Sequence, residues 1–132
     1  MSGCSCRCYR LLIVLTALSG ASVIVLGAWG AHELATSQQR VFDTALRYQV
    51  WHTLALVAVL MPMTKMRWRR LRSVCVLWWL GMTLFSGSLY LMALVGWRVG
   101  IVTPCGGLLL MAGWLGLAWQ WWRLARDERA IA

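Results

Sequence analysis

The stretch Leu11–Ala31, "LLIVLTALSGASVIVLGAWGA", decides the fold class because its 21 residues contain no charge. A helix rises about 1.5 Å per residue, so about 20 apolar residues cross the roughly 30 Å hydrocarbon layer of a membrane. Three more uncharged runs follow at Tyr48–Thr64, Ser73–Trp97 and Val99–Trp122. A soluble domain of 132 residues cannot bury four helices that are apolar on every side. The sequence therefore predicts an all-α integral membrane four-helix bundle.

The predicted bundle is a single domain, residues 1–132, with spans at about 9–31, 43–63, 73–96 and 100–122. The second run is short, so we expect the flanking Arg47 and Lys65 to extend toward the headgroups. We expect an outer loop at His32–Arg40 with Ser37 as a helix cap, and a helix that continues from there to Pro62. The segment Lys65–Arg72 is expected to be a short basic loop.

The net charge of +9 is distributed unevenly along the chain. With four spans, ten of the 13 Lys and Arg residues fall on the side that holds both termini and the middle loop. The positive-inside rule then predicts that both termini are cytoplasmic. It also favours anionic lipid at the basic loop as a partner, and disfavours nucleic acid.

The cysteines and the amino-terminal run leave two alternatives open. Cys4, Cys6 and Cys8 are expected in a disordered, reduced tail, because a soft metal would need a fourth ligand and a fold around it. We therefore expect no metal and no cofactor. The first span could instead be a signal peptide cleaved near Ala28-Trp29-Gly30, although its apolar run is longer than usual for one.

Five glycines are predicted helix-packing residues, because small residues let helix backbones approach closely in lipid. Several are seven residues apart and so lie on nearly one helix face. They are Gly20, Gly27, Gly81, Gly106 and Gly113.

Polar residues should converge on one layer in the outer half of the membrane, because helices one and three end there while two and four begin there. Tyr48 and His52 share a helix face that Gln49 flanks, and Ser86 and Tyr90 share another. This layer either locks the helices together or lines a site for a ligand or solute. The candidate residues are His32, Glu33, Arg47, Tyr48, Gln49, His52, Ser86, Ser88, Tyr90 and Thr103.

Four blocks in this order resemble the YgdD-like family of small bacterial inner-membrane proteins. They are "LGAWGAHEL" (26–34), "ALRYQVWHTLAL" (45–56), "LFSGSLYLMAL" (84–94) and "VTPCGGLLLMAGWLGLA" (102–118). Family members often have isoleucine or valine where Cys105 stands, so this thiol is not expected to be essential. The resemblance implies the topology given above and a bacterial inner-membrane location, and it implies no activity.

A structural or accessory membrane protein of the cell envelope is the primary functional hypothesis, with a homo-oligomer or another membrane protein as partner. The alternative is an oligomeric conduit for small solutes or ions through the outer polar layer, although the inner halves of the helices are apolar. A third hypothesis has His32 and His52 bind haem or a metal. We expect no enzyme, because the sequence has no HExxH or CxxC motif, phosphate-binding loop or spaced nucleophile–histidine–acid set.

Overall fold

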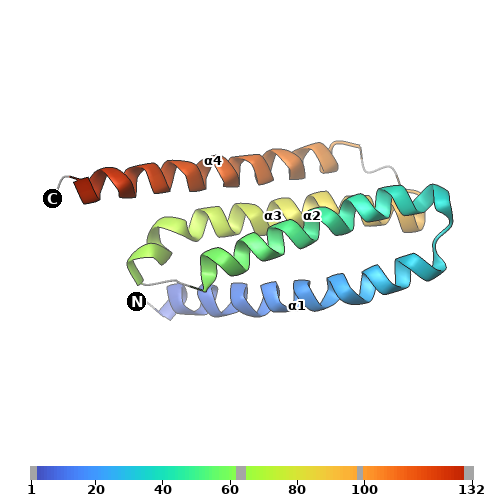
Figure 1. Ribbon diagram of the computed structural model, residues 1–132, viewed down its shortest axis with the longest axis horizontal. Helices are drawn as coiled ribbons and strands as arrows, with labels where there is room; N and C mark the ends of the chain where they lie inside the picture. Colours follow the sequence, from blue (N-terminus) through green and yellow to red (C-terminus); the bar gives the residue numbers. More distant parts are fainter. Residues whose placement is uncertain (1–2, 62–64, 98–99, 130–132) are drawn as a thin grey trace.

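The computed structural model describes residues 3–61, 65–97 and 100–129, which form four antiparallel helices. These are α1 (Gly3–Glu33), α2 (Thr36–Leu60), α3 (Lys65–Val95) and α4 (Val102–Arg129). Figure 1 shows both termini at one end of the bundle, together with the α2–α3 connection. We call this the basic end. The α1–α2 and α3–α4 turns lie at the opposite end, which we call the hairpin end.

Helices α2 and α3 form the middle of the bundle, with α1 on one side and α4 on the other (Figure 1). The strongest packing joins α3 to α4, followed by α2 with α3 and α1 with α2. Side-chain hydrogen bonds also connect α1 to α3 and α2 to α4. The arrangement is therefore a flattened four-helix bundle in which α1 and α4 occupy opposite edges.

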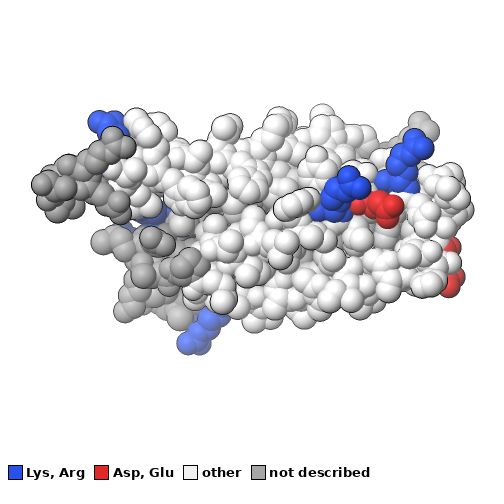
Figure 2. Space-filling view, in the orientation of Figure 1, with Lys and Arg blue, Asp and Glu red and all other residues white. Residues whose placement is uncertain are grey.

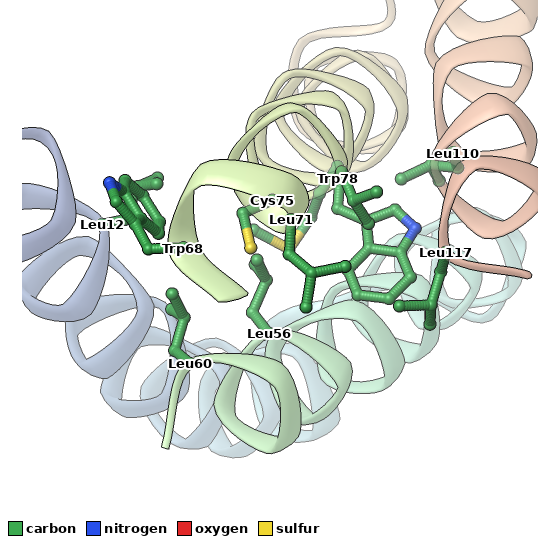
Figure 3. Close-up of a cluster of buried hydrophobic side chains, with 11 residues drawn as sticks. Leu12, Leu56, Leu60, Trp68, Leu71, Cys75, Trp78, Leu110 and Leu117 are labelled. Atoms are coloured by element: carbon green, nitrogen blue, oxygen red, sulfur yellow. The ribbon is translucent and has the colours of Figure 1, made fainter. Parts of the chain in front are cut away.

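The main hydrophobic cluster lies toward the basic end and receives side chains from all four helices (Figure 3). Trp68 and Trp78 of α3 are almost fully buried in it. Trp78 extends toward Leu110 and Leu117 of α4, while Trp68 lies beside Leu12 of α1. The basic-end half of the bundle is thus filled by apolar side chains, as the sequence indicated for this half.

Three helices are long and apolar enough to cross a membrane: Arg7–Glu33, Trp68–Val95 and Val102–Arg126. Their lipid-facing residues include many exposed large apolar side chains, such as Ile24 at 74% exposure and Leu115 at 72%. A water-soluble protein rarely exposes so much apolar surface. Helix α2 does not meet the same test of composition, because its hairpin-end half carries charged and polar residues.

Three local predictions from the sequence were wrong. The amino-terminal segment is helical from Gly3 rather than disordered, and the basic segment Lys65–Arg72 forms the first turns of α3 rather than a loop. Both segments extend helices that the bundle already holds in place, and helix propagation is easier than nucleation. The helix α2 begins after Ala35, so Ser37 lies inside the helix and is not its cap.

The two turns at the hairpin end are short. The α3–α4 turn uses Gly96 and Gly100, both with positive φ (74° and 37°), a conformation that glycine adopts without strain. The predicted helix end at Pro62 lies outside the described residues.

Candidate functional site

Gln49 of α2 is the centre of a hydrogen-bond network between three helices. Its side chain is only 8% exposed. The amide nitrogen donates to the hydroxyl oxygens of Ser22 (2.8 Å) and Ser19 (3.2 Å) on α1. The amide oxygen accepts a hydrogen bond from the Tyr90 hydroxyl of α3 at 2.7 Å. Both ends of one amide are therefore used to connect α2 to the helices on either side.

The network continues toward the basic end. Ser19 and Thr53 share a hydrogen bond of 2.8 Å between their hydroxyl oxygens, and the Thr53 hydroxyl contacts the Met82 sulfur at 3.7 Å. The indole nitrogen of Trp79 donates to the Thr16 hydroxyl at 3.3 Å. We call Thr16, Ser19, Ser22, Gln49, Thr53, Trp79 and Tyr90 the α1-side network.

His52 lies on the other side of α2 and connects it to α4. Its Nε2 lies 3.2 Å from the indole nitrogen of Trp114, and its Nδ1 lies 2.8 Å from the Tyr48 carbonyl oxygen. An indole N–H can only donate, so Nε2 must be the unprotonated acceptor. We assign the proton to Nδ1, which donates to the carbonyl. This assignment makes the imidazole neutral, with both nitrogens in hydrogen bonds.

Trp78 packs against the hydrogen-bonded pair of His52 and Trp114 but is not hydrogen-bonded to either residue. Its ring centroid is 4.7 Å from that of Trp114 and 6.3 Å from that of His52. Its indole nitrogen is buried and has no partner among the described residues. The ring instead lies against Gly113, where any added Cβ would be within 2.4 Å of it. Close packing with α4 thus takes the place of a hydrogen bond here.

Replacing Trp114 with phenylalanine is expected to lower the free energy of unfolding by about 1 kcal/mol, because Nε2 of the buried His52 then loses its donor. Unfolding in mixed micelles with increasing SDS measures this change. Trp119→Phe is the matched control, since Trp119 is on the same helix and is 55% exposed. Equal losses for the two variants would contradict the assigned hydrogen bond.

Two serines of α3 also form hydrogen bonds with neighbouring helices. Ser86 donates to the Ala45 carbonyl oxygen of α2 at 2.9 Å. Ser88 lies 2.7 Å from the Thr103 hydroxyl of α4 and also donates to the Phe85 carbonyl at 2.9 Å. These serines bond to their neighbouring helices, so α3 is connected to both α2 and α4.

The structure brings some of the candidate residues together and leaves others apart. Gln49 meets Tyr90, Ser88 meets Thr103, and the Tyr48 ring stacks on His52 at 6.2 Å and packs on Phe85 at 4.4 Å. These contacts lie on two sides of the α2–α3 pair rather than around one chamber. The three remaining candidates are exposed and bond to none of the others: His32, Glu33 and Arg47.

An open groove, rather than a closed chamber, accompanies the α1-side network. It has a volume of about 340 Å³ and lies between α1 and α3, with Gln49 at its base. Its walls include Leu15 and Leu18 of α1, and Thr83 and Gly87 of α3. The lining also includes Met82 of the main hydrophobic cluster, so the groove borders that cluster.

Sequence reasoning missed three polar residues of the first helix, one threonine of the second and two tryptophan donors. The missed residues are Thr16, Ser19, Ser22, Thr53, Trp79 and Trp114. Thr16, Ser19 and Ser22 are spaced by three, which places them on one helix face. That spacing was the available signal, and it pointed to the partner face of Gln49.

The predicted packing glycines differ in how closely their neighbours approach. A Cβ at Gly81, Gly106 or Gly113 would meet atoms of the facing helix at 2.8, 2.5 and 2.4 Å, so these three allow α3 and α4 to touch. At Gly20 and Gly27 the nearest atoms are at 3.8 and 3.3 Å. At Gly30, which was not predicted, an added Cβ would lie 2.5 Å from the Phe42 ring.

The α1–α2 contacts also fix the relative depth of residues on the two helices. Paired positions are Gly30 with Phe42, Gly27 with Leu46, Ser22 with Gln49, and Ser19 with Thr53.

His52 is therefore level with Gly20, whereas His32 is at the end of α1, about twelve residues or about 18 Å away. Two ligands of one metal ion are only about 4 Å apart, so these histidines do not form a joint haem or metal site.

No group of three His, Cys, Asp or Glu side chains gathers in the part of the chain that the structure describes. The described thiols of Cys8, Cys75 and Cys105 are free. Ser86 and His52 each bond elsewhere, so the geometry does not form a serine–histidine pair.

Comparison with known proteins gives one family match. A family described as "Protein of unknown function (DUF423)" matches residues 26–107. The UPF0382 inner membrane protein YgdD of Escherichia coli strain K12 is 39% identical over 112 residues, covering 80% of this chain and 84% of the relative. A UPF0382 membrane protein of Haemophilus influenzae is 39% identical over 113 residues, covering 81% and 90%. A third, SH2409 of Staphylococcus haemolyticus, is 38% identical over 120 residues, covering 82% and 92%. No solved structure matches.

Proposed function

This chain belongs to the DUF423 family, and we propose that it is a multi-pass membrane protein with a structural or accessory role in the cell envelope. The observation that carries this proposal is the Gln49 amide, whose two ends bond to Ser22 and Tyr90. Polar groups inside a membrane indicate a ligand or transport site when they have no hydrogen-bond partner within the protein. Here they are used to join helices, which supports a rigid scaffold.

In the proposed topology all four helices cross the membrane and both termini are cytoplasmic. Helix α2 lacks the apolar composition of the other three, but it runs beside α1 and α3 along its length (Figure 1). The concentration of Lys and Arg at the basic end supports its placement in the cytoplasm. The same cations are proposed to contact anionic lipid.

An accessory role needs a surface for a partner inside the membrane. The outward faces of α1 and α4 supply apolar surface, for example Leu18 at 60% exposure and Trp121 at 60%. In the proposal, these edges contact a second copy or another membrane protein. The alternative role as a conduit has less support, since the apolar cluster fills the basic-end half of the bundle.

The expected result in a deletion strain is that complementation follows the amount of folded protein. Thr53→Val and Tyr90→Phe remove single hydrogen bonds of the α1-side network, so each should lower stability and complementation together. Thr83→Val is the control, because the exposed Thr83 hydroxyl bonds only to the Trp79 carbonyl of its own helix. Immunoblots of membranes report the folded amount.

A network variant that is present at the wild-type level but fails to complement would contradict the structural role. It would indicate instead that the network forms a site. Solute flux into liposomes above that of empty vesicles would favour the conduit.

A further inference from the structure

The lipid-facing side of α2 carries charges at an unusual depth. Arg47 lies between Leu46, which is level with Gly27, and Gln49, which is level with Ser22, so it is level with Val25 of α1. Val25 is seven residues before His32, where the uncharged run of α1 ends. At 1.5 Å per residue, the Arg47 backbone lies about 10 Å inside the apolar layer.

A guanidinium at this depth needs a polar partner. Arg47 is exposed on the outside of the bundle, where lipid would surround it. Its long side chain can extend toward the hairpin end and so cover part of the distance to the headgroups. The remainder can be covered by a headgroup that is drawn toward the protein, as occurs where a bilayer thins locally around a charge.

The charges on this face follow a definite order. Asp43 is four residues from Arg47 toward the hairpin end, on the same side of α2, and is also exposed. Figure 2 shows an acidic group with basic groups on two sides of it over this part of the bundle, and a largely uncharged surface toward the middle of the bundle. Moving outward from the middle of the membrane, the order is therefore Arg47 and then Asp43, with Arg40 farther out at the edge of the apolar layer. Trp51, 64% exposed, lies one turn deeper.

We propose that this face binds the headgroup of a phosphatidylethanolamine molecule in the leaflet at the hairpin end. In this lipid the phosphate is nearer the acyl chains and the ammonium is farther out, which matches the order of Arg47 and Asp43. The guanidinium donates to the phosphate oxygens, and the Asp43 carboxylate accepts from the ammonium. The Trp51 ring packs against the glycerol and upper acyl region.

Other headgroups match this order less well. Phosphatidylcholine has no N–H to donate to Asp43, and phosphatidylglycerol has no cation for it. The competing arrangement is an ion pair within the helix, because an acid four residues before an arginine is favourably placed for one. In that case the charges of Asp43 and Arg47 compensate each other, and the protein does not prefer one headgroup over another.

Native mass spectrometry of the full chain, with the three lipids added at equal acyl composition, tests the proposal. The wild type is expected to retain phosphatidylethanolamine about five-fold over phosphatidylcholine, the factor that one exposed charge-assisted hydrogen bond from the ammonium to Asp43 can give. Arg47→Gln should lower the retention of all three lipids, because all three carry the phosphate that the guanidinium contacts, and should leave the preference for phosphatidylethanolamine over phosphatidylcholine in place. Asp43→Asn should reverse it in favour of phosphatidylglycerol, because an uncompensated cation remains.

Arg40→Gln is the matched control. Arg40 is exposed on the same helix but lies near the level of His32, at the edge of the apolar layer, so its replacement should leave both the retention and the preference unchanged. All three replaced side chains are exposed, and the variants should fold as the wild type does. Equal retention of the three lipids by the wild type would overturn the proposal. So would an effect of Arg40→Gln as large as that of Arg47→Gln.

Discussion

Gly106→Ala is expected to cause the largest loss of stability of any single methyl addition in the α3–α4 interface, about 3 kcal/mol in the free energy of unfolding. A Cβ at Gly106 would lie 2.5 Å from the Phe85 backbone nitrogen, 2.9 Å from its α-carbon and 3.0 Å from the Gly81 carbonyl oxygen. These are backbone atoms, so no side-chain rotation can make room. The two helices would have to separate along their length, which would also pull Trp78 from its contact with Gly113.

Gly87→Ala is the matched control for this prediction. Gly87 is also in the middle of a helix, but nothing lies within 4 Å of a Cβ added there. Alanine should therefore raise stability by about 0.5–1 kcal/mol through its helix preference. SDS titration monitored by circular dichroism compares the two variants. If Gly106→Ala were no more destabilising than Gly87→Ala, the close approach of α3 and α4 would be wrong.

Gln49→Leu is expected to cost about 2 kcal/mol, because it removes the amide that joins three helices while keeping a similar volume. Tyr90 would lose its acceptor, and Ser22 would lose its donor. Both groups lie in the membrane-spanning part of the bundle, where water cannot replace the lost bonds readily.

A double-mutant cycle with Tyr90→Phe isolates the bond between the Tyr90 hydroxyl and the Gln49 amide oxygen. Because this bond is 2.7 Å long, we expect a coupling free energy of about 1 kcal/mol. Tyr48→Phe is the control, since the Tyr48 ring is 41% exposed and packs on Phe85 rather than joining the α1-side network. Additive effects of Gln49→Leu and Tyr90→Phe would contradict the network.

The direction of a helix predicts how deep a residue lies in the bundle, but it does not predict which neighbouring helix the side chain contacts. Helix direction alone placed Gln49, Ser88 and Tyr90 in the half of the bundle toward the hairpin end. It could not separate residues that face α1 from residues that face α4. Gln49 and His52 are only three residues apart, yet they bond to opposite edges of the bundle. The polar residues of this half therefore form two sets of contacts, one toward α1 and one toward α4, beside an open groove.

Length and apolarity by themselves determined that this chain is a helical membrane bundle, because four uncharged runs of this size have no other stable solution. The chain also determined which glycines could allow close packing, through their spacing. Only the tertiary structure decided that Gly106 and Gly113 touch α3 closely whereas Gly20 remains loosely packed. Only it decided that the serines of α1 bond to Gln49 while Arg47 is exposed on the outside of the bundle. The physical reason is that lipid can solvate several faces of an apolar helix equally well. Which face is buried therefore depends on how the neighbouring helices pack against it.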